Sequence, residues 1–529
     1  MSAQLEQPRR MRWGIPIVIL VLALTAVLWL RAREGPFLEQ IILAVALLTA
    51  LALAFWYVFL TGLRWRTRFL VIGLAAAVIA GGTFGIRRLT RVEGSIGGSG
   101  MPRLVWRWAP RRDAYAGPLQ VASNTPPTAA APIPGAGVSF PQFLGPDRSG
   151  VLHGISLVRD WATSPPRQLW RHSVGVGWSA FAVSAGRAIT QEQRGEQELT
   201  VAYDLATGAP LWVHTNQVRF HEMLGGDGPR ATPTIREGRV YVMGATGILD
   251  CLEEASGQIL WSRDVLRENK LKNITWGKSC SPLLVGRLVV VTGGEQRQKS
   301  LLAYDAQGGQ PVWQSGRDQS SYGSPMVATL AGQEQILIVN GHSVSGHKPE
   351  DGRLLWAYPW PGEFPKVAQP LPLDTNLLLV ATGYGIGCSL LQLQPSASGE
   401  WAVTEVWKNR NLKPKFTNLV KYGRHVYGLD DGVLVCLDPA TGQRVWKDGR
   451  YGHGQILLVE DVLLIQTEPG DVVLVEATPE GHREQARLPA LKAKTWNNPV
   501  VVGDILLVRN DQEAACYRLP VVRVPTAGR

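Results

Sequence analysis

The chain has 529 residues and a formal net charge of +11, which is spread unevenly along its length. Residues 1–137 contain 15 arginines, no lysine and only 5 acidic residues, whereas the remaining residues are nearly balanced at +1. The longer part therefore lacks the basic surface of a nucleic-acid-binding protein, and no nucleic-acid partner is expected.

Three nearly uncharged apolar runs occupy residues 14–30, 37–63 and 69–86. Each is about long enough to cross a bilayer core of roughly 30 Å as a helix. A cleaved signal peptide is the alternative for the first run, but no small-residue cleavage site follows it and two further runs come directly after. The sequence predicts a membrane domain of three transmembrane helices over residues 1–93, with the lipid bilayer as partner.

Arginines at the ends of these runs give a weak indication of orientation. With the N-terminus inside, the cytoplasmic segments hold six basic residues and the opposite side holds five. The positive-inside rule then favours a multi-pass protein of the inner membrane with the following domain periplasmic. Residues 94–138 are rich in Gly, Pro, Ala and Ser and show no helical or strand period, so they are predicted to be an extended linker.

A repeat dominates residues 139–529. Its clearest copies are YDLATGAPLW, LEEASGQILW, YDAQGGQPVW and LDPATGQRVW, in which a tight turn precedes a short strand that ends in tryptophan. Successive tryptophans lie 42, 49, 52, 43, 51 and 39 residues apart, a period typical of four-stranded propeller blades. We interpret these residues as structural, each covering the gap to the next blade: Trp170, Trp212, Trp261, Trp313, Trp356, Trp407 and Trp446.

Counting the Pro-containing segments that open each unit gives eight blades, with seven as the alternative. The seventh unit has Leu488 at the tryptophan position, and the eighth ends after three strands. The segment around Trp170 reads as a fourth strand with no blade before it. The sequence thus predicts an all-β, eight-bladed propeller in which this N-terminal strand completes the C-terminal blade and removes open sheet edges.

Metal and haem chemistry find no support in the sequence. The five cysteines lie singly in apolar segments without a CxxC or CxxCH motif, so buried free thiols are expected. The nine histidines show no metal-ligand spacing. No metal site is predicted.

The repeated turn before tryptophan resembles the tryptophan-docking repeat of the pyrroloquinoline quinone (PQQ) propeller superfamily. The superfamily includes quinoprotein alcohol and glucose dehydrogenases and the non-enzymatic propeller lipoprotein of the outer-membrane barrel assembly machinery. The segments GDGPRATPT, VYGLDDGVLVCLDPATG, RYGHGQ and RNDQEAACYRL also resemble bacterial membrane-anchored PQQ-like repeat proteins. The resemblance covers about residues 140–519 and implies the fold more strongly than any activity.

For a quinoprotein dehydrogenase, the resemblance implies PQQ in the central funnel, Ca²⁺ held by carboxylate and amide oxygens, an aspartate base and planar groups around the cofactor. The chain lacks the vicinal disulfide of the alcohol dehydrogenases. Membrane glucose dehydrogenases, which lack that disulfide and have N-terminal spans, are the closer enzymatic analogy, although the present blades are shorter. The barrel assembly lipoprotein uses an acylated N-terminal cysteine, and here no cysteine precedes Cys251.

Polar residues near turns and blade starts are candidates for a funnel surface. Lysine, arginine and histidine together suit an acidic ligand or a carboxylate-bearing cofactor, and Asp430 or Asp431 suits a base. Asp430 and His453 are the catalytic candidates, while the alternative for Asp430, Asp431 and Gly432 is a plain hairpin turn. Candidates for cofactor binding, each of which has a structural alternative in turns and blade contacts, are Arg230, Trp276, Lys278, Lys415, Lys494, Trp496 and Asn497.

Two functional hypotheses follow. The first is a membrane-anchored propeller that acts as a binding or scaffolding module in a bacterial envelope, with a protein partner. The second is a PQQ-dependent oxidoreductase of sugars or alcohols that passes electrons to membrane quinone. The complete ring without a catalytic signature favours the first.

Overall fold

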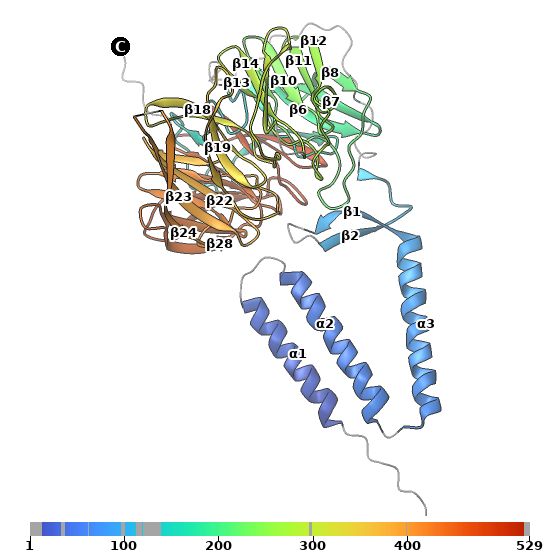
Figure 1. Ribbon diagram of the computed structural model, residues 1–529. Helices are drawn as coiled ribbons and strands as arrows, with labels where there is room; N and C mark the ends of the chain where they lie inside the picture. Colours follow the sequence, from blue (N-terminus) through green and yellow to red (C-terminus); the bar gives the residue numbers. More distant parts are fainter. Residues whose placement is uncertain are drawn as a thin grey trace, which may run out of the picture. The chain divides into compact units, whose positions relative to one another are not determined.

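Figure 1 shows a computed structural model of the chain, which describes residues 13–32, 38–61, 63–96, 101–112, 119, 139–295, 299–397 and 399–522. The chain divides into two units, Met1–Ala109 and Pro110–Arg529. Most of the predicted linker, residues 113–118 and 120–138, lies outside the described residues.

The N-terminal unit contains the three expected helices. They are α1 (Gly14–Ala32), α2 (Leu38–Phe55), which continues into the short π-helix η1 (Trp56–Leu60), and α3 (Trp65–Leu89). All three are long and apolar enough to cross a membrane. Helix α3 begins four residues before the predicted apolar run, and Arg68 in its first turns donates hydrogen bonds to the carbonyls of Val58 and Thr61 near the end of η1.

A two-stranded hairpin follows α3 directly, formed by β1 (Thr90–Ile96) and β2 (Met101–Trp106). The sequence pattern predicts no strand here. Arginine side chains add hydrogen bonds to the backbone pairing: Arg107 Nε donates to Thr90 O at 3.1 Å, and Arg91 Nη1 donates to Arg107 O at 2.8 Å. The two strands, TRVEGSI and MPRLVW, lack a regular alternation of apolar and polar residues, so the hydrophobic pattern carries no signal for them.

The second unit is a propeller of eight blades, and the predicted fold class is confirmed (Figure 1). Each blade contains four antiparallel strands, numbered here in their order across the sheet. Blade 1 comprises β5 (Ala182–Ser184), β6 (Arg187–Arg194), β7 (Gln197–Asp204) and β8 (Pro210–Asn216), and blade 2 comprises β9 (Thr234–Arg236), β10 (Arg239–Met243), β11 (Ile248–Glu253) and β12 (Ile259–Asp264), followed by α4 (Val265–Glu268). Blade 3 comprises β13 (Leu283–Val285), β14 (Leu288–Thr292), β15 (Leu301–Asp305) and β16 (Pro311–Ser315). Blade 4 comprises β17 (Met326–Leu330), β18 (Gln333–Val339), β19 (Ser343–His347) and β20 (Leu354–Pro359).

Blades 5 to 8 follow the same order. Blade 5 comprises β21 (Leu371–Asp374), β22 (Leu377–Thr382), β23 (Gly387–Pro395) and β24 (Trp401–Asn409), and blade 6 comprises β25 (Val420–Tyr422), β26 (His425–Asp430), β27 (Val433–Asp438) and β28 (Gln443–Arg450). Blade 7 comprises β29 (Gln455–Val459), β30 (Val462–Gln466), β31 (Val472–Glu476) and β32 (Glu484–Leu488). Blade 8 comprises β33 (Val500–Val502), β34 (Ile505–Arg509), β35 (Glu513–Arg518) and β4 (Arg167–Ser173). The apolar second and third strands are almost completely buried, and all five cysteines are buried free thiols, as expected.

Ring closure occurs in blade 8, as the sequence predicted. Strand β4 pairs antiparallel with β35, with Trp170 opposite Cys516. Arg509, which is fully buried, then joins blade 8 to blade 1, because its guanidinium donates to Thr190 Oγ1 at 2.6 Å and to the carbonyl of Gln191 at 2.9 Å. The pairing of β4 with β35 therefore completes blade 8 and closes the ring.

The turn between the third and fourth strands is where one blade contacts the next. In six blades the indole N–H of the fourth-strand tryptophan donates to a carbonyl of the next blade's turn, as from Trp212 to Glu254 at 3.0 Å. The other five donors are Trp170, Trp261, Trp313, Trp407 and Trp446. We call this end of the ring the docking face.

Blades 4 and 7 do not dock in this way. Trp356 donates instead to Gln335 Oε1 of its own blade at 2.7 Å, because the long strands of blade 5 are joined by a different turn near Gly399. Blade 7 ends in Leu488, and the third and fourth strands of blade 8 come from opposite ends of the chain, so no turn joins them. A tryptophan is absent or redirected where the next blade lacks the turn.

The segment before β4 lies inside the ring. Phe140 pairs with Val183 of blade 1, Arg148 Nη1 donates to the carbonyl of Pro282 in blade 3 at 2.8 Å, and β3 (Val151–Leu152) runs parallel to β29 of blade 7. Val183 and β29 both lead into turns between first and second strands. Residues 140–152 thus fill part of the channel at the docking-face end.

Candidate functional site

The opposite end of the ring carries the candidate site. We call it the funnel face, and it is formed by the turns between second and third strands and by the connections from each fourth strand to the next blade. Every sequence-predicted candidate lies on one of these segments. In a blade of antiparallel strands, every second turn lies at the same end of the blade. The candidate residues lie on such turns or on the connections between blades, so the topology places them on one face.

Aromatic rings gather in two groups on this face. Trp178 lies 4.9 Å from Trp496 between ring centroids, and Trp496 lies 4.7 Å from Phe416. Phe364 stacks on Tyr384 at 5.1 Å and an interplanar angle of 11°. We call these five residues the aromatic chain. Such rings offer large, half-exposed apolar area at little entropic cost, as binding surfaces commonly do.

Two lysines lie against the aromatic chain. Lys494 Nζ is 3.9 Å from the ring centroid of Trp496 and 5.0 Å from that of Trp178, and burial lowers its pKa to about 8. Lys415 Nζ lies 5.3 Å from the ring of Tyr384, and burial lowers its pKa as well. These cations place positive charge among the rings, where an anion would be favoured.

His453 lies between these groups but is poorly suited to act as a base. Its Nε2 is 3.5 Å from Lys415 Nζ, and its ring meets Phe416 edge-on at 5.7 Å. Burial, together with the Lys415 charge, lowers the pKa of His453 to about 4. The imidazole is therefore neutral near pH 7 and accepts protons weakly.

Glu468 holds this region in place. Its Oε1 accepts a hydrogen bond from Trp496 Nε1 at 2.8 Å, and its Oε2 accepts one from the backbone N–H of His453 at 3.0 Å. The carboxylate joins blades 7 and 8 beneath the rings. It thereby fixes the orientation of the Trp496 indole.

Arg230 and Trp276 lie on the connections that precede blades 2 and 3. The Arg230 guanidinium is held by the carbonyls of Gly226 and Gly228 and lies 4.6 Å from the Phe220 ring centroid, and burial lowers its pKa to about 10. Trp276 packs against Tyr322 at 5.5 Å. These residues extend the cationic and aromatic character of the face.

Two other candidates have structural contacts. Lys278 is fully buried, and its ammonium donates to the carbonyl and hydroxyl of Thr292 at 2.7 Å each and to the carbonyl of Gly293. Asn497 is also buried and donates to Ser179 O at 2.8 Å, which joins blade 8 to blade 1. Both stabilise the ring from within.

Asp430 is enclosed in a cluster of cations. It is fully buried, lies 2.9 Å from Lys447 Nζ and 4.0 Å from Arg444, and also contacts Lys413. Asp431 follows it in a left-handed conformation with φ of 47°, and burial raises its pKa. The pair forms the turn between β26 and β27, and Asp430 has no access to a substrate.

Sequence reasoning missed Trp178, Phe364, Tyr384, Phe416 and Glu468. Four of these are aromatic residues near glycine or proline on the connections and turns. That position is a usable signal, because an aromatic side chain outside the strands has no place in the blade core. Glu468 carried no such signal, because its role depends on two neighbours that the fold brings together.

The quinone arrangement expected from the resemblance fits this face only in part. Planar rings are present, but the described residues contain no group of three or more His, Cys, Asp or Glu side chains able to hold a metal ion. The carboxylate proposed as base is enclosed by lysines. The residues present therefore do not fit the Ca²⁺ that accompanies PQQ.

These features define the class: a closed, tryptophan-docked, eight-bladed PQQ-like propeller. A family model described as outer membrane protein assembly factor BamB matches residues 162–448, more than half of the chain, and the chain belongs to this family.

The chain is also similar to several known proteins. The outer membrane protein assembly factor BamB of Shewanella oneidensis is 24% identical over 300 residues, which cover 52% of this chain and 70% of that protein. The crystal structure of BamB from Moraxella catarrhalis has 16% identity and a TM-score of 0.48, covering 67% of this chain and 99% of that one. A europium-containing methanol dehydrogenase has 12% identity and a TM-score of 0.54, covering 70% and 89%, a likeness of fold alone.

Proposed function

We propose that this protein is a membrane-anchored propeller that binds a protein partner in the bacterial cell envelope through its funnel face. The family and fold support a binding or scaffolding role. Helices α1, α2 and α3 support anchoring in the inner membrane as a multi-pass protein, and the arginine distribution favours a periplasmic ring.

The state of the two catalytic candidates carries the proposal. Asp430 is buried among cations, and burial lowers the pKa of His453 to about 4. Asp430 is therefore closed off from a substrate, and His453 accepts protons weakly at pH 7, whereas a general base works best with a pKa near the operating pH. The aromatic chain and its lysines form instead a surface for an acidic partner segment with aromatic or apolar side chains.

Site-specific photo-crosslinking in cells tests this role. A benzophenone amino acid in place of Trp178 or Trp276 on the funnel face should give one crosslinked species of defined mass. The same replacement of Val312, a 42% exposed residue on an outer strand, should not. Lys494→Glu should reduce the crosslink from Trp178, since it reverses the charge that attracts the partner.

Equal crosslinking from Val312, or none from either funnel position, would contradict the proposal. The quinoprotein alternative is tested separately by calorimetric titration of PQQ into the purified chain with and without Ca²⁺. Saturable binding, followed by dye reduction with sugars or alcohols, would replace the binding role with an oxidoreductase.

A further inference from the structure

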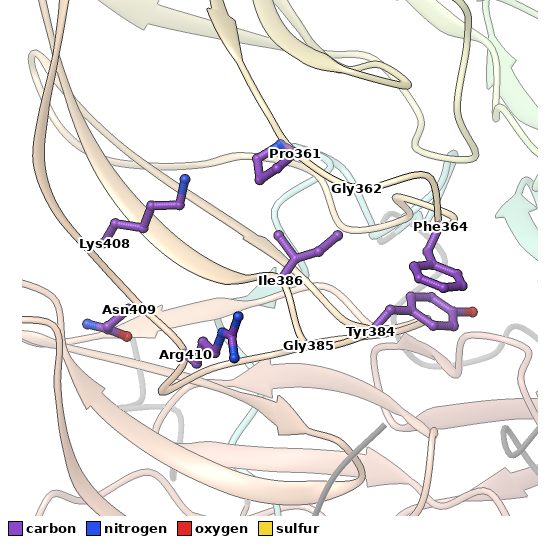
Figure 2. Close-up of a pocket in the computed structure, with 9 residues that line it drawn as sticks. All are labelled: Pro361, Gly362, Phe364, Tyr384, Gly385, Ile386, Lys408, Asn409 and Arg410. Carbon is purple, nitrogen blue, oxygen red and sulfur yellow. The ribbon is translucent and has the colours of Figure 1, made fainter. Parts of the chain in front are cut away.

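A pocket of about 480 Å³ opens on blade 5 and on the connection that leads to it from blade 4 (Figure 2). Three segments of the funnel face line it: the connection after β20, the turn between β22 and β23, and the end of β24. Its volume is in the range of sites that hold small ligands or a pair of side chains. The lining residues are Pro361, Gly362, Phe364, Tyr384, Gly385, Ile386, Lys408, Asn409 and Arg410.

Strand geometry brings two cations to this pocket. Trp407 and Asn409 point toward blade 6, where Trp407 Nε1 donates to Pro439 O at 2.9 Å and Asn409 Nδ2 donates to Gly442 O at 2.8 Å. Side chains alternate between the two faces of a strand, so Lys408 and Arg410 point to the other side, toward the pocket.

Acidic neighbours neutralise these cations only in part. Glu405 forms an ion pair with Lys408, 3.9 Å from its Nζ, and Glu363 pairs with His342 at 3.2 Å. None of the residues that line the pocket is acidic, and Arg410 lines it together with Lys408. Two cations against one paired acid give the pocket a positive field for an entering group.

The opposite wall is aromatic and held in place. Tyr384 has φ of 58°, a conformation that bulky residues rarely adopt, and it persists here between Phe364 on one side and the Lys415 ammonium on the other. Gly362, with φ of 90°, lets its loop close on Ile386, whose Cδ1 would lie 2.6 Å from an added Cβ. Phe364 is 40% exposed.

We propose that this pocket binds a carboxylate adjoining an aromatic ring, presented by a segment of the protein partner. The inference rests on the proposed function and adds where and how the partner is recognised. Lys408 and Arg410 pair with the carboxylate, and the partner's ring stacks on the Phe364–Tyr384 wall.

The probes for a first experiment are N-acetylphenylalanine and its neutral amide, which share the ring and differ in the carboxylate. Binding to the purified full-length chain is measured by equilibrium dialysis. The acid should bind at least about tenfold more tightly than the amide, and Lys408→Gln with Arg410→Gln should remove that preference. Arg424→Gln, an exposed cation on the β25–β26 turn, is the matched control and should leave it unchanged.

Equal binding of the acid and amide, or a preference lost in Lys494→Gln and kept in the double variant, would overturn the assignment of this pocket. A second experiment places the photo-crosslinker at Pro361. The same species captured from Trp178 should appear and should decrease in the double variant. If Trp178 captures a partner and Pro361 does not, the pocket proposal fails and the proposed function stands. If neither funnel position captures one, the proposed function fails, whatever the probes show.

Discussion

The two ends of the ring are built differently. On the docking face, one turn and one indole contact recur in six of eight blades with donor–acceptor distances of 2.9–3.1 Å. On the funnel face, the corresponding segments differ in every blade and carry Lys494, Lys415 and Arg230 among aromatic rings. The repeat encodes the fold, and the departures from it carry the binding surface.

The largest expected effect concerns a funnel-face cation that is structural. Arg509→Met should lower the free energy of unfolding by about 3–5 kcal/mol, because three acceptors at the blade 8–blade 1 junction lose their donor in a buried site. Urea unfolding followed by tryptophan fluorescence measures it, with Arg424→Met as the exposed control. A loss below about 1 kcal/mol would show that β4 pairing alone closes the ring.

Two glycines test the docking contact directly. Gly257 has φ of 71°, and an added Cβ would lie 2.3 Å from the Trp212 indole, whereas Gly399 has φ of 81° and open space around it. Gly257→Ala should lower the free energy of unfolding by about 2–4 kcal/mol and Gly399→Ala by about 1 kcal/mol. Both changes place alanine at a positive φ, so the difference between the two losses measures the steric contact with Trp212. Equal losses in urea unfolding would mean that the indole moves aside freely.

The contrast between the docking face and the funnel face also explains which features the sequence predicted. A local repeat predicted the blade count, the closure by β4 and the positions of the tryptophans. Each of these features can be recognised from residues that are close together in the sequence. The redirected indole of Trp356 could not be predicted, since it depends on a turn some forty residues later in blade 5. The candidate site residues lie on one face because of the topology. The sequence could not show that Lys278 is buried among carbonyls while Lys494 lies against aromatic rings, since both surroundings depend on the fold.

Lys278 provides a pH-dependent prediction. Burial lowers its pKa to about 8, below the ordinary value of 10.5, so between these pH values the unfolded chain binds more protons than the native one. Stability from this group therefore rises as the pH increases from about 8 to 10.5, by at most about 3 kcal/mol. In Lys278→Met this rise should be absent. Unfolding of both proteins across that range gives the difference, and parallel curves would contradict it.

The smallest effect on stability is expected at Lys494. This residue tests whether the cations of the funnel face serve binding and not the stability of the ring. Lys494→Met keeps the aliphatic stem against Trp178 and Trp496 and removes only a charge that burial disfavours, so the free energy of unfolding should change by less than about 1 kcal/mol. The crosslink from Trp178 should nevertheless fall several-fold. A large loss of stability with unchanged crosslinking would make Lys494 a structural cation like Arg509. The positive charge of the funnel face would then stabilise the ring and not bind a partner.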